Sequence, residues 1–156
     1  MTKVAPQSPV NILSASWRDL GALRSLESVC FPVDAWPLLD LIGVLSLPNV
    51  VRLKAVVQDQ MVGFVAGDIH RNEDMAWIAT IGVRPDFQRQ GIASLLLQAC
   101  EDRLNVSRVR LSVRVTNKPA IRLYEGFGYR QVGIWSSYYQ DGSNAIVFEK
   151  NMRIAL

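Results

Sequence analysis

The chain has 156 residues and a mass of 17.4 kDa, which is the length of one ordinary domain. Hydrophobic residues make up 49% of it and charged residues 20%, a globular composition that excludes wholesale disorder. The most apolar stretch, residues 38–51, is interrupted by Asp40 and Pro48. It is shorter than the roughly 20 residues of a membrane span, so we expect no membrane association.

The net charge of +3 and the pI near 9.1 suit an anionic ligand such as a coenzyme. No basic block or nucleic-acid motif occurs, so we predict no nucleic-acid partner. Residues 1–9 lack the apolar run of a signal peptide and are expected to form a loose leader to a single domain, residues 1–156. We therefore expect a cytoplasmic protein in which Cys30 and Cys100 are reduced. His70 is the single histidine, so we expect neither a metal site nor a Ser–His–Asp triad.

The first half of the chain predicts two helices and four strands. Ser16, followed three residues later by Asp19, has the pattern of a capping box and begins the first helix. Pro37 is suited to the start of the second helix, and a tight turn at Asp59-Gln60 joins two strands into a hairpin. The predicted elements are a strand at 10–13, helices at 16–29 and 37–47, and strands at 50–57, 61–69 and 75–83.

The second half predicts two helices and three strands. Between residues 108 and 115, valine and leucine alternate with arginine and serine, which indicates a strand with one buried face. Asn117 is suited to cap the next helix, and Asp141-Gly142 is suited to turn a final hairpin. The predicted elements are a helix from 92 to 104, a strand at 108–115, a helix at 117–126, and strands at 129–139 and 145–152. The order βααβββαβαββ predicts a mixed α/β (α+β) fold on a mainly antiparallel central sheet.

Residues 83–94 run from a strand into a helix through a polar turn. The first backbone N–H groups of a helix have no intrahelical partner, and the dipole adds about half a positive charge, so such a start can bind phosphate. Gly91 lacks a Cβ and Ala93 is small, which permits close approach of a pyrophosphate. The alternative is a polar turn with a helix-starting glycine and no ligand. The spacing alone does not decide between these two interpretations.

Two segments resemble a known family. Gln88-Arg89-Gln90-Gly91-Ile92-Ala93 matches the Gln/Arg-x-x-Gly-x-Gly/Ala signature of the GNAT superfamily of acetyltransferases, and residues 117–129 resemble its second conserved block. Within the superfamily the chain is most similar to the ribosomal-protein alanine N-acetyltransferase branch, through Cys30-Phe31-Pro32, Tyr138-Tyr139 and Asp141-Gly142. The resemblance covers nearly all of the chain. It implies a GNAT fold with helices on both faces of the sheet.

The resemblance also implies a site. Acetyl-CoA, the expected co-substrate, would lie where the strands at 75–83 and 108–115 separate, with Tyr124 as the catalytic acid and the Val83 N–H stabilising the oxyanion. Phe31, Tyr138 and Tyr139 would border the acceptor. The implied coenzyme-binding residues are Ile81, Gly82, Val83, Gln88, Arg89, Gln90, Gly91, Ile92, Ala93, Ser94 and Asn117. Taken alone, Asn117 also suits a plain helix cap and Tyr124 a core aromatic residue.

The implied activity is direct acetyl transfer to a primary amine, namely the N-terminal α-amine of a protein such as a ribosomal protein. One residue departs from the branch, which carries a glutamate base where this chain has Ser112. Glu27 is another candidate, and the sequence does not assign the base. The alternatives are an acetyltransferase for small-molecule amines and an idle acyl-CoA-binding module. We expect a monomer or a homodimer.

Overall fold

Seven strands form one sheet in the computed structural model, which describes residues 8–152. The strands are β1 (Asn11–Ser14), β2 (Val50–Val57), β3 (Gln60–His70), β4 (Met75–Val83), β5 (Arg108–Arg114), β6 (Arg130–Trp135) and β7 (Ala145–Asn151). Their order across the sheet is β1-β2-β3-β4-β5-β7-β6. β4 and β5 are parallel, and the other neighbouring strands are antiparallel. The predicted mixed, mainly antiparallel sheet is confirmed.

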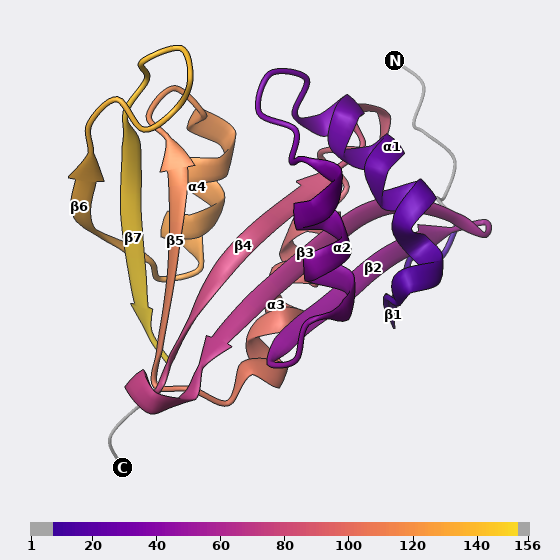
Figure 1. Cartoon of the computed structure of the whole chain (residues 1–156), viewed down its shortest axis with the longest axis horizontal. Helices are drawn as coiled ribbons and strands as arrows, with labels where there is room; N and C mark the ends of the chain where they lie inside the picture. Colours follow the sequence, from indigo (N-terminus) through magenta and orange to yellow (C-terminus); the bar gives the residue numbers. More distant parts are fainter. Residues whose placement is uncertain (1–7, 153–156) are drawn as a thin grey trace, which may run out of the picture.

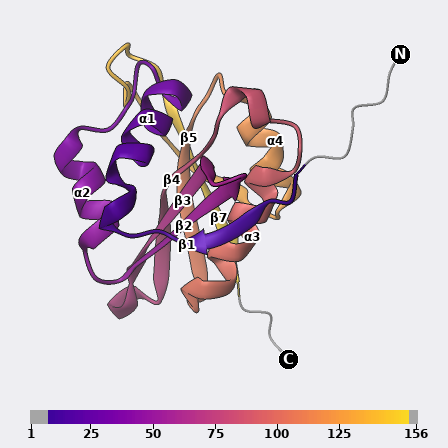
Figure 2. The same ribbon diagram turned by 90° about the vertical axis from the view of Figure 1, so that its right-hand side faces the viewer.

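Within residues 8–152, four α-helices cover the two faces of this sheet. They are α1 (Leu20–Cys30), α2 (Leu38–Ser46), α3 (Ile92–Leu104) and α4 (Lys118–Gly126). Figure 2 shows α1 and α2 on one face and α3 and α4 on the other. Each face has its own buried cluster of side chains. The predicted order βααβββαβαββ and the GNAT fold are confirmed, while residues 1–7 of the predicted leader lie outside the described residues.

Two helix starts follow the local sequence. Ser16 accepts a hydrogen bond from the Arg18 N–H, and its own N–H donates to Asp19 Oδ2 at 2.9 Å, so the predicted capping box forms. It opens a 3-10 turn, and α1 begins after it, at Leu20. Asn117 caps α4, because its Oδ1 accepts a hydrogen bond from the Ala120 N–H at 3.3 Å.

The predicted strand at 129–139 is wrong in its second part. β6 ends at Trp135, and residues 136–144 form a loop that contains the expected turn at Asp141-Gly142. Ser137 has a φ of 52°, a left-handed conformation that interrupts an extended strand, and its N–H donates to Asn144 Oδ1 at 2.8 Å. The rings of Trp135, Tyr138 and Tyr139 contact one another in sequence within this region.

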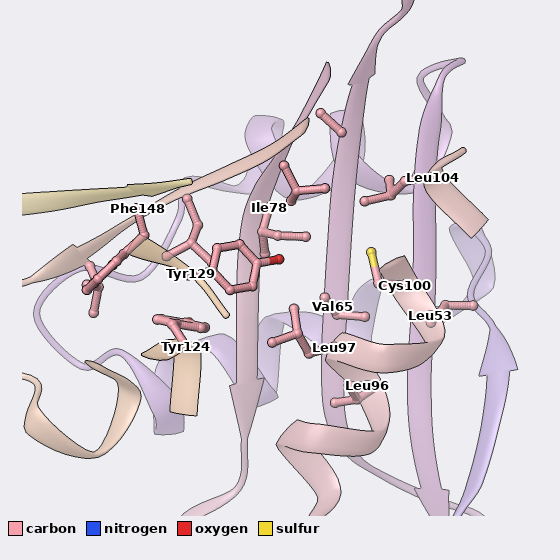
Figure 3. Close-up of a cluster of buried hydrophobic side chains, with 14 of the residues drawn as sticks. Leu53, Val65, Ile78, Leu96, Leu97, Cys100, Leu104, Tyr124, Tyr129 and Phe148 are labelled. Carbon is pink, nitrogen blue, oxygen red and sulfur yellow. The ribbon is translucent and has the colours of Figure 1, made fainter. Parts of the chain in front are cut away.

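Helix α3 packs closely on β3. Leu96 and Leu97 of the helix point toward the sheet and are completely buried (Figure 3). The approach is close at Gly63, where a Cβ would lie 2.9 Å from Leu96 Cδ1 and 3.2 Å from the carbonyl oxygen of Gly82. The absence of a side chain at Gly63 thus fixes the distance between helix and sheet.

Gly63→Ala is therefore expected to lower the free energy of unfolding by about 1–3 kcal/mol, because the added methyl group meets a packed side chain and a strand carbonyl. Gly133→Ala is the matched control on β6, since its Cβ would meet nothing within 4 Å. It should leave the stability unchanged or raise it by about 0.5 kcal/mol. Chemical denaturation of both variants measures the difference, and equal stabilities would contradict this packing.

Candidate active site

The candidate site begins where β4 and β5 separate. Their pairing covers Met75, Ala76 and Trp77 on β4, opposite Arg108 to Arg110 on β5. Beyond it the two strands diverge, as Figure 1 shows. Ala79 is an extra residue on β4, because the register against β3 shifts there. Such a bulge bends a strand and increases its twist, which directs the end of β4 away from β5.

A cleft of about 880 Å³ opens at this separation, within the range of small-molecule sites. Its walls come from four segments: the α1–α2 loop, the middle of β4, the end of β5 with the start of α4, and the β6–β7 loop. The predicted residues that line it together are Phe31, Ile81, Asn117, Tyr124, Tyr138 and Tyr139. Gly82, Val83 and residues 88–94 are not among the lining residues. Gly82 and Val83 end β4 beyond the cleft, and residues 88–94 form the turn that leads into α3 and its first residues.

The edge of β4 that faces the gap carries backbone groups without a strand partner. The Arg84 N–H donates to the Val62 carbonyl of β3 at 2.8 Å. Because successive residues of a strand point to opposite sides, the N–H groups of Ile81 and Val83 point away from β3 and into the gap. The Val83 carbonyl accepts a hydrogen bond from Gln88 Nε2 at 3.0 Å, so Gln88 supports the end of the strand.

The start of α3 has the open geometry that the sequence predicts. Gly91 has a φ of +81°, and a Cβ there would meet nothing within 4 Å. No side chain caps the helix, and the first intrahelical bond runs from the Leu95 N–H to the Gly91 carbonyl. The amides of residues 92–94 consequently have no partner within the helix and are available to an anion.

Tyr124 lies on α4 at the floor of the cleft, and its side chain is 6% exposed. Its ring makes an edge contact with Tyr129, with centroids 6.0 Å apart, and a tilted contact with Phe148. Figure 3 shows the three rings grouped beside Ile78 of β4. A tyrosine is already neutral at physiological pH, and burial raises the pKa of Tyr124 well above its ordinary value, so the phenol stays protonated and can donate a hydrogen bond.

A buried polar group holds Tyr129 in this position. The Tyr129 hydroxyl donates to Glu101 Oε2 at 2.7 Å, and Lys150 Nζ donates to Glu101 Oε1 at 2.8 Å. The Glu101 side chain is 1% exposed, so the neighbouring ammonium group compensates the buried carboxylate. No sequence pattern predicts this group, since its members come from α3, β7 and the residue before β6.

The two candidate bases occupy different positions. Ser112 lines the cleft from β5, whereas Glu27 is buried behind it on α1. Glu27 accepts hydrogen bonds from the Trp36 N–H at 3.3 Å and from the Thr80 hydroxyl at 3.2 Å. Burial raises the pKa of the Glu27 carboxyl, and these hydrogen bonds partly oppose the rise. Thr80 itself lines the cleft, so its hydroxyl connects the buried carboxylate to the cavity.

Phe31 and Cys30 close the cleft above β4. A Cβ at Gly82 would lie 3.2 Å from Phe31 Cε2, so glycine at this position lets the Phe31 ring rest on the strand. Burial raises the pKa of the Cys30 thiol to about 11, which keeps it protonated at neutral pH and unsuited to act as a nucleophile. The geometry therefore favours direct transfer over an acyl-cysteine intermediate.

The β5 arginines form ion pairs. Arg108 and Arg110 pair with Glu149 of β7. Arg114 pairs with Asp34 and Asp141, and its guanidinium carbon lies 4.2 Å from the centre of the Tyr139 ring. Sequence reasoning missed these pairs. The available signal was one arginine and two aspartates in segments that the resemblance placed around the cleft.

Two kinds of feature are absent from residues 8–152. None of the helices in this range is long and apolar enough to span a membrane. The same residues contain no cluster of three or more histidine, cysteine or carboxylate side chains arranged to hold a metal ion.

The fold is that of a family of acyl-transferring proteins. The model of the acetyltransferase (GNAT) family matches residues 20–129, and the chain belongs to this family. It is 43% identical over 72 residues to the N-alpha-acetyltransferase of Sulfolobus acidocaldarius, covering 44% of this chain and 43% of that protein. It is 36% identical over 92 residues to the ribosomal protein bS18-alanine N-acetyltransferase of Salmonella typhimurium, covering 57% of this chain and 61% of that protein.

Among solved structures, the ribosomal-protein-S18-alanine N-acetyltransferase of Escherichia coli superposes with a TM-score of 0.86 at 27% identity. That superposition covers 95% of this chain and 97% of the other. In sequence, the chain spans between 43% and 61% of the length of the first three curated relatives that it matches. The sequence match to the Salmonella protein and the superposition on the Escherichia coli structure confirm the predicted resemblance to the ribosomal-protein alanine branch.

Proposed function

We propose that the protein transfers the acetyl group of acetyl-CoA directly to the N-terminal α-amine of a protein or peptide. The observation that carries this proposal is the unpaired edge of β4, which faces Tyr124 across one cleft and continues into the uncapped start of α3. A strand edge suits amide groups, a helix start suits phosphates, and a neutral phenol suits a leaving thiolate.

The coenzyme is assigned to this edge in three parts. The pantetheine amides pair with β4 as an added strand at Val83, and the pyrophosphate accepts from the amides at the start of α3. The thioester carbonyl is assigned to the Ile81 N–H in place of the Val83 N–H, because Ile81 lines the cleft with Tyr124 and Val83 does not. Asn117 uses Oδ1 to cap α4, which leaves its Nδ2 group to donate to the coenzyme arm.

In the proposed reaction, the neutral amine attacks the thioester carbonyl, the C–S bond breaks, and CoA leaves as the thiolate. Tyr124 donates a hydrogen bond to the departing sulfur. The ordinary phenol pKa near 10 already lies above that of a thiol near 8.5, and burial raises it further. Full proton transfer is therefore uphill and is completed by reprotonation of Tyr124 from solvent.

The attacking amine must also lose a proton. We assign this proton to Glu27, through the hydroxyl of Thr80. Asp34 and Asp141, the carboxylates among the cleft-lining residues, are both paired with Arg114. Glu27 has neutral hydrogen-bond donors, and its raised pKa makes it a stronger base than an exposed glutamate.

The α-amine is favoured over a lysine amine because its ammonium form has the lower pKa. With a pKa of about 7.7–8.0, roughly a third of an α-amine is neutral at pH 7.5, against about 0.1% of a lysine amine with a pKa near 10.4. A cationic small molecule would be held best by free carboxylates, and the two in the cleft walls are both already paired with Arg114. An idle acyl-CoA-binding module would not need a proton donor such as Tyr124 in the cleft where β4 and β5 separate.

The acceptor class is tested with matched peptides and mass spectrometry. We expect acetylation of a lysine-free peptide with a free N-terminus, and none of the same sequence with a blocked N-terminus and an added lysine. Polyamines and aminoglycosides complete the panel. Acetylation of these amines alone would overturn the assignment, and acetyl-CoA binding without transfer to any amine would favour the idle module.

Gly91→Glu should abolish most acetyl-CoA binding, because a carboxylate would occupy the pyrophosphate position. The φ of +81° at position 91 strains any residue with a side chain, so we also expect the free energy of unfolding to fall by about 1–2 kcal/mol. Gly128→Glu is the matched control, with a φ of +95° away from the cleft. Calorimetry should show that both variants lose stability and that Gly91→Glu alone loses the coenzyme. Equal coenzyme affinity in the two variants would place the cradle elsewhere.

Tyr124→Phe should lower kcat about 100-fold and leave the Kd for acetyl-CoA within about twofold, since it removes the proton donor and keeps the ring. Tyr138→Phe serves as the control because Tyr138 also lines the cleft but is 53% exposed. Steady-state kinetics and calorimetry separate the two effects. A parallel loss of turnover and coenzyme affinity would reduce Tyr124 to a packing residue.

Glu27→Gln should lower kcat about 100-fold because the amide keeps the contacts to Trp36 and Thr80 but cannot take a proton. Ser112→Ala is the comparison, and we expect its kcat to stay within about threefold. Thermal unfolding verifies that both variants fold. The reverse pattern, a large loss in Ser112→Ala alone, would transfer the role to Ser112 and a water that it holds.

A further inference from the structure

The Arg114 guanidinium connects two loops that are far apart in sequence. Nη2 donates to Asp34 of the α1–α2 loop, and Nη1 donates to Asp141 of the β6–β7 loop at 2.8 and 2.9 Å. The guanidinium also lies 4.2 Å from the centre of the Tyr139 ring. In Figure 1 the two loops flank the open end of the gap between β4 and β5.

This connection lies where the sheet provides none. Strand pairing joins β4 to β5 over residues 75–77 and 108–110, at the closed end of the gap. Asp34 belongs to the half that includes β4, and Arg114 belongs to the half that begins with β5. The Arg114–Asp34 pair therefore joins the two halves at the open end, and its side chains are only 20% and 28% exposed.

Arg114 lies on the acceptor face and away from the coenzyme elements. Along β5, Leu111 and Val113 point into the cluster beneath α3, so Arg114 points to the opposite face, toward the α1–α2 loop. Both of its partners line the cleft. The Arg114–Asp141 pair holds at neutral pH, because the Ser143 N–H and Arg114 lower the pKa of Asp141 to about 2.

We propose that Arg114 is a positioning residue for the acceptor: it ties the two loops together and fixes the entrance through which the amine reaches the acetyl group. This inference rests on the proposed function. A flexible entrance would have to be ordered each time an acceptor binds, and a tethered one is ordered in advance. Loss of the tether should therefore raise the KM for the peptide, with a small effect on kcat and on acetyl-CoA binding.

A purely electrostatic role makes a different prediction. If Arg114 acted only by its charge, Arg114→Gln would free two carboxylates and lower the KM for a cationic amine, while Asp34→Asn would raise it. A tether predicts the same sign for both, because each substitution cuts the same link. The double variant should then be little worse than Arg114→Gln alone.

Arg110→Gln is the matched control. Arg110 lies on the same strand and face, and it pairs with Glu149 at 2.7 Å without reaching either loop. We expect Arg114→Gln and Asp34→Asn each to raise the peptide KM about tenfold, and Arg110→Gln to leave it within about twofold. The Kd for acetyl-CoA, measured by calorimetry, should be unchanged in all three and shows that each variant is folded.

Hydrogen exchange gives a second readout that needs no turnover. Amides in residues 31–37 and 136–144 should exchange faster in Arg114→Gln than in the wild type and in Arg110→Gln. Unchanged exchange in both loops, opposite KM shifts in the two tether variants, or an unchanged KM would each overturn the inference. A wild-type enzyme that acetylates no free N-terminus would instead overturn the proposed function, and the acceptor role of Arg114 with it.

Discussion

The separation of β4 from β5 after three paired residues is the constraint on which the rest of the site depends. A strand in the middle of a sheet normally satisfies its backbone groups on both sides, and an unsatisfied buried N–H costs as much as a lost hydrogen bond. The N–H groups of Ile81 and Val83 are therefore directed at whatever fills the gap. The bulge at Ala79 and the tight packing of α3 at Gly63 hold β4 in this divergent path.

The two faces of the sheet offer different binding surfaces at the two sides of the gap. The uncapped start of α3 serves an anion, while the α1–α2 and β6–β7 loops form aromatic and apolar walls whose carboxylates are already paired. Tyr124 lies between the faces and Glu27 lies behind Thr80, and burial raises the pKa of both groups. Burial thus keeps the phenol protonated as a hydrogen-bond donor and makes the carboxylate a stronger proton acceptor.

The sequence predicts what short-range patterns encode. The alternation in β5, the capping box at Ser16 and the glycine at the start of α3 each depend on neighbours within a few residues, and each is found in the structure. The second part of the predicted 129–139 strand is wrong because Ser137 takes a left-handed φ. A serine in the sequence does not indicate this conformation, which is most common at glycine. The link between Arg114 and Asp34 spans 80 residues, so only the assembled fold brings it together.

Amide exchange along β4 tests the central claim most directly. The account predicts that acetyl-CoA slows exchange at Ile81 and Val83 about tenfold or more, because their N–H groups face the gap and gain a partner there. Gly82 and Thr80, which alternate with them and face β3, should change little. Resolved amide exchange by NMR, with and without coenzyme, gives this comparison. Equal rates at Ile81 and Val83 with and without acetyl-CoA would contradict the placement of the coenzyme on this edge.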